Sequence, residues 1–204
     1  MHRISFATTN EGKIKYFNRI LSEYGIEVVP SRVEMPEPRS YDVGEIAEAK
    51  VRYASSIIKD ECIALDSGFF IPALNGFPRT FVNFALDSIG IGGFLKLMDQ
   101  EKDRRCAFKS CLAYIDKEGS VKKFYSEAEG TIAIAATGNK PDYAWSDLYR
   151  IFIPKDKEKT LSEMSKGEYE DWSGSLESCE HSFAEWFVNK GEQYGDRRKD
   201  IERH

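Results

Sequence analysis

A polar loop near the start of the chain carries side chains that could bind a phosphate group. Residues 8–13 read Thr8-Thr9-Asn10-Glu11-Gly12-Lys13 and separate a strand-like apolar segment at 4–7 from a helical pattern. Such a loop offers backbone N–H groups and the positive end of the helix to an anion, and its hydroxyl, amide and ammonium groups add donors. The alternative is structural: Asn10 caps the helix and Lys13 lies on the solvated surface.

A second group of candidates combines two carboxylates with a lysine. Glu37 lies between two prolines that stiffen its segment, and Asp66 follows the apolar segment 62–65, where a strand is expected to end. Two rigidly placed carboxylates can share Mg²⁺, which takes few protein oxygens and adds phosphate oxygens, and Lys50 would complement the same phosphates. For each residue alone, the alternative is ordinary surface charge.

Apolar periodicity and turn residues predict the elements that position these side chains. Strands are expected at 4–7, 26–30, 62–65 and 148–154, hairpin strands at 106–115 and 121–134, and an extended segment at 69–74. Helices are expected at 13–24, at 46–58, at 81–98 with a break at 90–93, and around 176–187 at the end. Capping boxes are expected at Asp42 with Glu45 and at Thr160 with Glu163. This order predicts an α/β fold, a two-lobed mixed sheet with flanking helices and a cleft between the lobes.

Length and composition are typical of one globular domain. The 204 residues are 41% hydrophobic, which is enough for one substantial core. We expect residues 1–190 to form a single two-lobed domain, and the polar tail 191–204 to be disordered or helical. No apolar run approaches the roughly 18 residues of a membrane-spanning helix, so we expect neither membrane insertion nor secretion.

Charge and cysteine content exclude some classes of function. The net charge of −5 gives no sign of the basic surface of a nucleic-acid-binding protein, and a polyanionic ligand would need locally placed cations. The four cysteines stand far apart, without a Cys-x-x-Cys pair or clustered histidines. This spacing argues against structural zinc and a disulfide framework and favours a reducing cytoplasm.

Several motifs in fixed order become specific when they are taken together. They are Thr8-x-Asn10-x-x-Lys13, Pro36-Glu37, Leu65-Asp66-Ser67-Gly68-Phe69-Phe70, Ala73-Leu74-Asn75-Gly76-Phe77-Pro78, Ile151-Phe152-Ile153-Pro154 and Thr160-Leu161-Ser162-Glu163-Met164. This series closely resembles the inosine triphosphate pyrophosphatase family, which acts on non-standard purine nucleoside triphosphates. The resemblance spans roughly residues 3–190.

The resemblance implies a two-lobed α/β fold, usually in a homodimer, that cleaves a nucleoside triphosphate with Mg²⁺ to a monophosphate and pyrophosphate. By position, the phosphate-binding residues would be Thr8, Asn10, Lys13, Lys50 and Ser67. Glu37 and Asp66 would hold the metal and the catalytic water, and either carboxylate could act as the base.

The base-recognition part of the family pattern is missing. A lysine and a Ser-His-Arg triplet normally follow the Thr-x-x-Glu-Met segment to hold the 6-oxopurine, but residues 169–175 here read Tyr-Glu-Asp-Trp-Ser-Gly-Ser. His181 lies further along, where a helical surface or packing role is expected. Trp145 or Tyr149 could stack on a base, and the alternative for both is hydrophobic packing.

Two further departures concern the phosphate side. Arg79 replaces the usual glycine after Pro78, and Asn83 stands where a basic residue is expected, so Arg79 could restore that charge. We therefore expect a pyrophosphatase with altered or relaxed base specificity. The alternatives are a non-catalytic member that binds nucleotide or phosphate, and a structural protein that retains only the fold.

Overall fold

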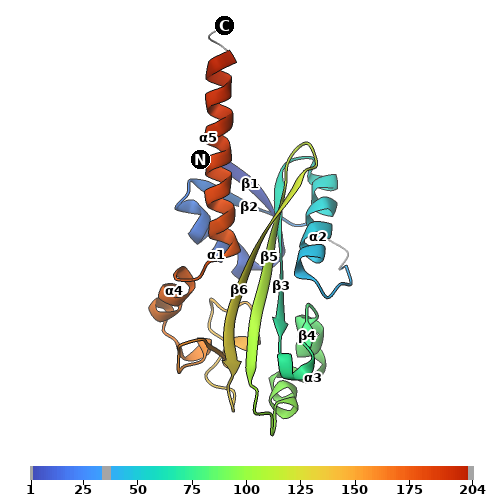
Figure 1. Ribbon diagram of the computed structural model, residues 1–204, viewed down its shortest axis with the longest axis vertical. Helices are drawn as coiled ribbons and strands as arrows, with labels where there is room; N and C mark the ends of the chain where they lie inside the picture. Colours follow the sequence, from blue (N-terminus) through green and yellow to red (C-terminus); the bar gives the residue numbers. More distant parts are fainter. Residues whose placement is uncertain (1, 34–37, 202–204) are drawn as a thin grey trace.

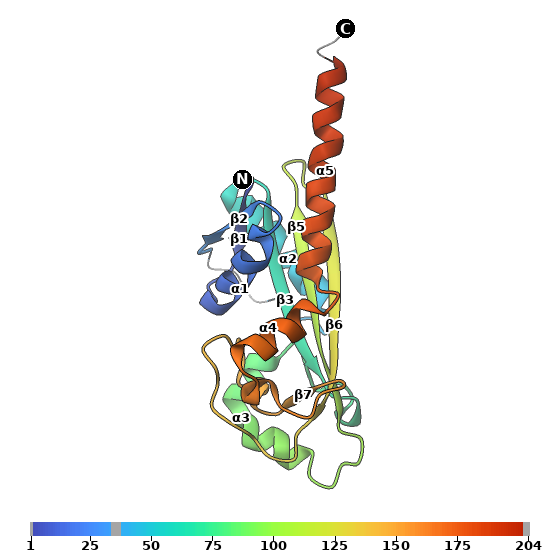
Figure 2. The ribbon, with the colours of Figure 1, turned by 90° about the vertical axis from the view of Figure 1, so that its left-hand side faces the viewer.

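The computed structural model describes residues 2–33 and 38–201, with side chains up to residue 190. Long strands run through the molecule with helices on both faces, and the last helix projects from the body (Figure 1; Figure 2). The strands are β1 (His2–Ala7), β2 (Ile26–Ser31), β3 (Cys62–Phe70), β4 (Pro78–Arg79), β5 (Arg105–Ile115), β6 (Val121–Ile132) and β7 (Phe152–Pro154). The α-helices are α1 (Glu11–Ser22), α2 (Val43–Ile58), α3 (Val82–Leu97), α4 (Lys166–Gly174) and α5 (Cys179–Ile201).

The strands of the described residues form one mixed sheet. Its order is β2-β1-β3-β5-β6-β7, and β4 pairs with β3. β1 runs parallel to both β2 and β3, whereas β5, β6 and β7 continue the sheet in antiparallel fashion. The α/β class and the mixed sheet predicted from the sequence are therefore confirmed.

One edge of β3 is shared by two short partners. β5 pairs with β3 over its whole length, so β1 and β4 must occupy the other edge. β1 pairs with β3 only at residues 62 and 63, and β4 only at residues 69 and 70. No strand of the described chain covers that edge at residues 64–68, which we call the open edge. Asp66 lies within it, so the prediction that the strand ends at Asp66 was wrong: pairing with β5 keeps the backbone extended.

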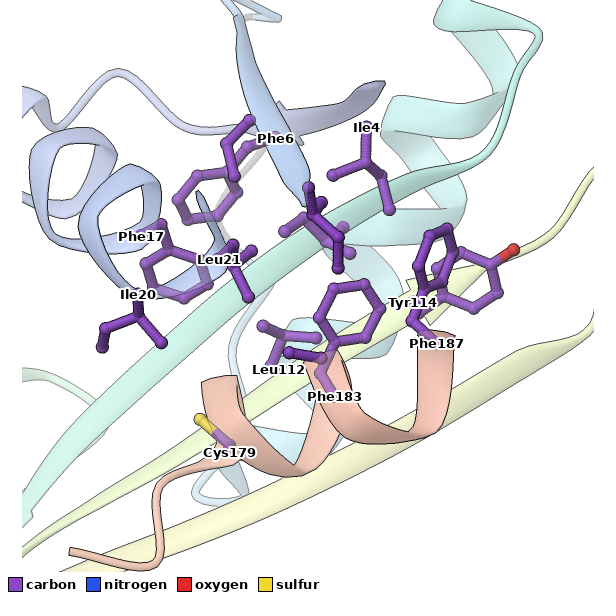
Figure 3. Close-up of a cluster of buried hydrophobic side chains, with 14 of the residues drawn as sticks. Ile4, Phe6, Phe17, Ile20, Leu21, Leu112, Tyr114, Cys179, Phe183 and Phe187 are labelled. Atoms are coloured by element: carbon purple, nitrogen blue, oxygen red, sulfur yellow. The ribbon is translucent and has the colours of Figure 1, made fainter. Parts of the chain in front are cut away.

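The first lobe packs helices against both faces of the sheet. Apolar side chains of β1, α1, α5 and the central strands form a buried cluster, in which the Phe6 and Phe17 rings lie 4.5 Å apart and the Tyr114 and Phe183 rings 5.9 Å apart (Figure 3). On the opposite face, α2 contacts the sheet through small side chains such as Ala47. Small residues bring this helix close to β3, and α2 carries Lys50.

The second lobe has its own apolar cluster. Phe69 at the end of β3 lies 6.5 Å from Phe94 of α3 and 6.2 Å from Phe152 of β7, measured between ring centroids. Gly90 interrupts α3 with φ 60° and ψ −176°, which confirms the predicted break. Two separate clusters at different parts of the same long strands account for the two lobes.

Some predicted elements differ from the observed ones. The strand expected at 148–154 is shorter, because residues 147–150 form a 3-10 turn before β7. Residues 191–201, for which disorder and helix were both open, continue α5, and α4 was not predicted. The second capping box is confirmed: Glu163 accepts a hydrogen bond from the Thr160 N–H at 2.9 Å. In the parts of the chain described, no helix is both long and apolar enough to cross a bilayer.

Gly68 on the open edge lets β4 approach β3 closely. A Cβ atom at this position would lie 2.7 Å from the carbonyl oxygen of Arg79. We expect Gly68→Ala to displace β4 and to lower the free energy of unfolding by about 1–3 kcal/mol in urea denaturation. Gly167→Ala is the control, because its Cβ would meet nothing within 4 Å and alanine favours α4. Equal stability of the two variants would contradict this prediction.

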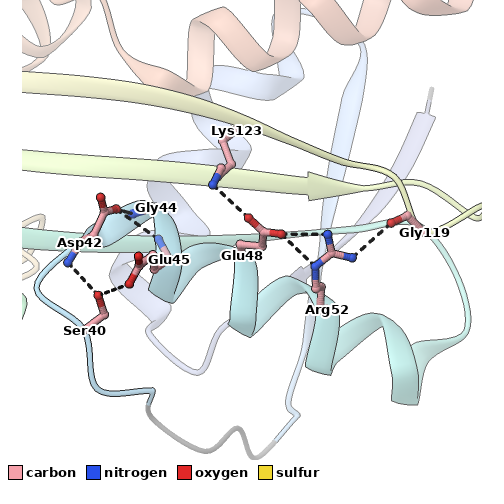
Figure 4. A network of polar contacts seen from close by, with 8 residues as sticks. All are labelled: Ser40, Asp42, Gly44, Glu45, Glu48, Arg52, Gly119 and Lys123. Atoms are coloured by element: carbon pink, nitrogen blue, oxygen red, sulfur yellow. Dashed lines mark hydrogen bonds and ion pairs between the residues drawn. The ribbon is translucent and has the colours of Figure 1, made fainter.

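Asp42 caps the helix that carries Lys50. Its Oδ1 accepts hydrogen bonds from the N–H groups of Gly44 at 2.6 Å and Glu45 at 3.2 Å, and Ser40 links this cap to the Glu45 carboxylate (Figure 4). We expect Asp42→Ala to cost about 1 kcal/mol of unfolding free energy, whereas Asp42→Asn keeps an acceptor and costs less. Chemical denaturation of both variants tests this, and an Asn variant as unstable as the Ala variant would argue against the cap.

Candidate active site

The open edge of β3 forms a wall of a cavity of about 560 Å³. Its other walls come from the β1–α1 loop, α1, α2, the start of α3, β5, β6, residues 145–149, α4 and the start of α5. The cavity therefore lies between the lobes, where the sequence predicted a cleft. Its volume falls within the range of about 300–1,000 Å³ that is typical of small-molecule sites.

The loop after β1 contributes donors and a buried ammonium group. Asn10 Oδ1 accepts a hydrogen bond from the Lys13 N–H at 3.1 Å, and Thr8 Oγ1 accepts one from the Asn10 N–H at 3.2 Å. Asn10 thus caps α1, as the structural interpretation predicted. The Lys13 side chain lines the cavity instead of the solvated surface. Burial lowers the pKa of Lys13; Asp66 counteracts this shift and Lys50 adds to it.

Lys50 and Asp66 come together from α2 and β3. Lys50 Nζ donates to Asp66 Oδ1 at 2.8 Å, and the two side chains are only 14% and 11% exposed. The sequence placed these two residues in one candidate set, and the structure brings their side chains together. Such a pair, away from bulk water, keeps both charges beside the space that a ligand would occupy.

A row of serines crosses the sheet beside this pair. Ser67 of β3 lies opposite Ser110 of β5, and Ser110 lies opposite Ser126 of β6. The Ser67 and Ser110 hydroxyl oxygens are 2.9 Å apart, and all three residues line the cavity. Ser110 and Ser126 were not predicted. The available signal was alternation, because Ser110 lies between Phe108 and Leu112, and Ser126 between Phe124 and Ala128, on the apolar face of each strand.

The donor set for a metal is small in the described chain. Glu37, the second predicted carboxylate, lies outside the described residues. Among the residues that are described, no group of three His, Cys, Asp or Glu side chains could hold a metal ion. Asp66 is a buried carboxylate at the cavity, with the Ser67 hydroxyl next to it in sequence. A single buried carboxylate fits a hard cation that takes further ligands from a bound phosphate, as Mg²⁺ does, better than a closed protein site.

The two aromatic candidates for base binding differ in their surroundings. Tyr149 is buried, its hydroxyl lies 3.2 Å from that of Tyr169, and burial raises its pKa, although its ring borders the cavity. Trp145 contacts Tyr16 edge to face at 4.8 Å and lies 6.0 Å from Lys13 Nζ. Its buried Nε1–H has no hydrogen-bond partner among the described residues. Trp145 lines the cavity through atoms other than this nitrogen.

Two other residues lie away from the cavity. His181 is on α5, as predicted, and its Nδ1 lies 2.8 Å from the Ser178 hydroxyl. The Arg79 guanidinium donates to the Asn75 carbonyl at 2.9 Å and stacks on Tyr41 at 4.4 Å. Neither side chain is among the lining residues, so neither replaces a missing base or phosphate contact in this conformation.

Glu180 is a cavity residue that the sequence interpretation missed. It is 4% exposed and lies in the first turn of α5. A signal was present, because Glu180 stands three, four and seven residues before the buried Phe183, Ala184 and Phe187. This spacing places the carboxylate on the apolar face of the helix.

The fold of this chain occurs in solved structures. A HAM1 protein from Coxiella burnetii matches with a TM-score of 0.75 and 22% identity, over 95% of this chain and 100% of that chain. At this identity the likeness concerns the fold alone.

Sequence comparison identifies the family. The model of the Ham1 family matches residues 4–181. The dITP/XTP pyrophosphatase of Methanopyrus kandleri is 35% identical over 187 residues, which cover 92% of this chain and 97% of that protein. The dITP/XTP pyrophosphatase of Ignicoccus hospitalis is 33% identical over 165 residues, covering 80% and 86%. The chain belongs to the Ham1 family, and the resemblance inferred from the motifs is confirmed.

Proposed function

We propose that this chain is a Mg²⁺-dependent pyrophosphatase that cleaves a nucleoside triphosphate to a nucleoside monophosphate and pyrophosphate. Its substrates would be purine nucleotides of the non-standard kind, with altered base specificity. The observation that carries the proposal is the buried Lys50–Asp66 ion pair at the cavity, which Lys13 also lines. The names of the relatives, dITP/XTP pyrophosphatases, support the same reaction.

The phosphates would bind along the open edge. Lys13 and Lys50 supply positive charge, and the start of α1 presents its backbone donors near Thr8 and Asn10. The Ser67 hydroxyl adds a donor from β3. Charge-assisted hydrogen bonds of this kind are about twice as strong as neutral ones, which suits a triphosphate in a protein of net charge −5.

Asp66 and Glu37 would hold Mg²⁺ together with phosphate oxygens. When bound, the cation supplies positive charge that offsets the negative charge developing on the phosphates. A carboxylate of this pair orients the attacking water and accepts one of its protons. Water adds to the α-phosphorus, the bond from this phosphorus to the oxygen bridging to the β-phosphate breaks, and pyrophosphate leaves with the bonding electron pair. Lys50 fixes the Asp66 carboxylate through the contact at 2.8 Å.

A product screen tests this function. Inosine, xanthosine, guanosine and adenosine triphosphates are incubated with the protein, with Mg²⁺ or with a chelator, and pyrophosphate and orthophosphate are measured separately. We expect pyrophosphate only, and only with Mg²⁺. Orthophosphate as the direct product would mean that another bond is cleaved. Nucleotide binding without any product would favour the non-catalytic alternative.

We also propose a cytoplasmic homodimer. All four cysteines are buried and outside disulfides, which suits a reducing compartment. α3 exposes apolar side chains, among them Phe84 at 70% and Leu97 at 46%, which suit a contact between two copies. Light scattering after size exclusion should give twice the chain mass of 23.3 kDa, and a mass of one chain would contradict the dimer.

A further inference from the structure

One buried carboxylate at the cavity has no part in the proposed hydrolysis. Glu180 is 4% exposed, and within the described chain the thiol of its neighbour Cys179 interacts with its carboxylate, which contributes to the raised pKa of Cys179 after burial. A thiol is a weak donor, whereas an ionised carboxylate accepts several hydrogen bonds and is costly to bury without them. Glu180 therefore has acceptor capacity that a ligand in the cavity can fill.

The side chains around Glu180 suit a flat ligand with a polar edge. Burial raises the pKa of Tyr16, and the charge of the nearby Glu180 carboxylate raises it further. Trp145, another residue that lines the cavity, packs against the same tyrosine at 4.8 Å. The Glu180 charge also opposes the lowering of the Lys13 pKa by burial. Glu180, Tyr16 and Trp145 therefore adjoin the lysine that is assigned to the phosphates.

We propose that Glu180 reads the base: its carboxylate accepts a hydrogen bond from N1–H of a 6-oxopurine, and from the 2-amino group where one is present. This inference rests on the proposed function, which puts a nucleoside triphosphate in the cavity. An ionised carboxylate can only accept, so it favours the adjacent N1–H and 2-amino donors of guanine and the single N1–H of hypoxanthine. Adenine presents a lone pair at N1, which repels it.

This mode of reading differs from the family pattern in its polarity. The missing lysine and Ser-His-Arg groups would donate hydrogen bonds to the base, whereas Glu180 accepts them. The described structure thus exchanges donors for an acceptor at the wall of the cavity. Preference should follow the number of donors that the base edge presents, in the order guanosine, inosine, adenosine, so the altered specificity proposed above would extend to the standard base guanine.

Equilibrium binding tests the inference independently of turnover. The probes are the non-hydrolysable α,β-methylene triphosphates of guanosine, inosine and adenosine, measured by isothermal calorimetry with Mg²⁺. We expect the guanosine analogue to bind about tenfold or more tightly than the adenosine analogue. Glu180→Gln replaces one acceptor oxygen by a donor, and should weaken guanosine binding about 10- to 100-fold while changing adenosine binding less than about threefold.

Matched variants separate base reading from other effects of the substitution. Glu185→Gln removes the same charge from an exposed position on α5 and should leave all three affinities unchanged. Glu180→Asp keeps an acceptor and should retain the guanosine preference in part. Thermal denaturation of each variant confirms that it is folded.

Three results would overturn the inference. Glu180→Gln weakening all three analogues equally would assign Glu180 to the first turn of α5, whose N–H groups also attract a carboxylate, or to the charge of Lys13. If the wild type binds the 2′-deoxy guanosine analogue as weakly as Glu180→Gln binds the guanosine analogue, Glu180 contacts the sugar and not the base. No preference of the wild type for guanosine or inosine over adenosine would exclude an acceptor at N1.

Failure of the proposed function looks different. Base-dependent binding without pyrophosphate release would leave the reading by Glu180 intact and reject the hydrolysis. Pyrophosphate release that is equal for all purines, before and after Glu180→Gln, would do the reverse. If none of the three analogues binds, both proposals are rejected.

Discussion

Asp66→Asn is expected to lower kcat for pyrophosphate release by about 10²- to 10⁴-fold, the range over which a positioned acid or base contributes. The amide draws Mg²⁺ less strongly and does not take a proton from water. Because Asp66 lies inside a strand that β5 holds along its length, the variant should keep the fold of β3. Its main structural cost is the loss of a carboxylate facing Lys50 at 2.8 Å.

Steady-state kinetics at saturating substrate and Mg²⁺, with a thermal melt alongside, measure both effects. Asp87→Asn makes the same chemical change at an exposed position of α3 and should leave kcat unaltered. A near-normal kcat for Asp66→Asn would remove this residue from the catalytic machinery. A large loss of kcat together with unfolding would require repeating the assay well below the melting temperature.

Lys13→Ala is expected to raise KM about 10- to 100-fold with a smaller change in kcat, since a hydrogen bond to a charged group contributes about 1.5–3 kcal/mol. The matched control is Lys15→Ala, which removes an exposed lysine two residues along α1 and should change KM little. Equal KM values for Lys13→Ala and the wild type, with the same response to salt, would assign Lys13 to no phosphate contact.

The same residue gives a stability effect whose sign follows from its pKa. Burial lowers the pKa of Lys13 below its ordinary value of 10.5, so the folded state disfavours the charged ammonium. This cost is present at pH values below the lowered pKa and disappears as the pH rises toward 10.5. The wild type should therefore gain stability relative to Lys13→Ala between neutral pH and pH 10, as measured by urea denaturation. A difference that stays constant over this range would contradict the buried charge.

Local patterns predicted most of the secondary structure and part of the site. The strand, polar loop and helix at the start of the chain are where the apolar spacing placed them, and the cap at Asn10 follows from its side-chain chemistry. The sequence grouped Lys50 with Asp66 as candidates for the same site, but it did not predict that the two side chains pair. This pairing could not have been derived from spacing, because the two residues lie on elements that only tertiary packing brings together.

Long-range pairing explains what the sequence did not predict. Asp66 and Gly68 interrupt an apolar run and locally favour a strand end, but β5 holds the strand extended as far as Phe70. The open edge depends on where β1 and β4 stop, which no local pattern encodes. Glu180 was missed for a related reason: base contacts were sought near residues 169–175, whereas the cavity also takes the start of α5.

The strands β3, β5 and β6 extend through both lobes, so the two apolar clusters pack against the same strands (Figure 2). Packed clusters resist deformation, and a change in the width of the cavity must therefore come from twisting of these strands. Within the described chain, residues 64–68 of β3 pair only with β5, so this stretch has strand pairing on one edge alone. A nucleotide lying along this stretch would stabilise β3 where it has the fewest pairing partners. Amide hydrogens of β3 far from the ligand would then exchange more slowly in the complex than in the free protein.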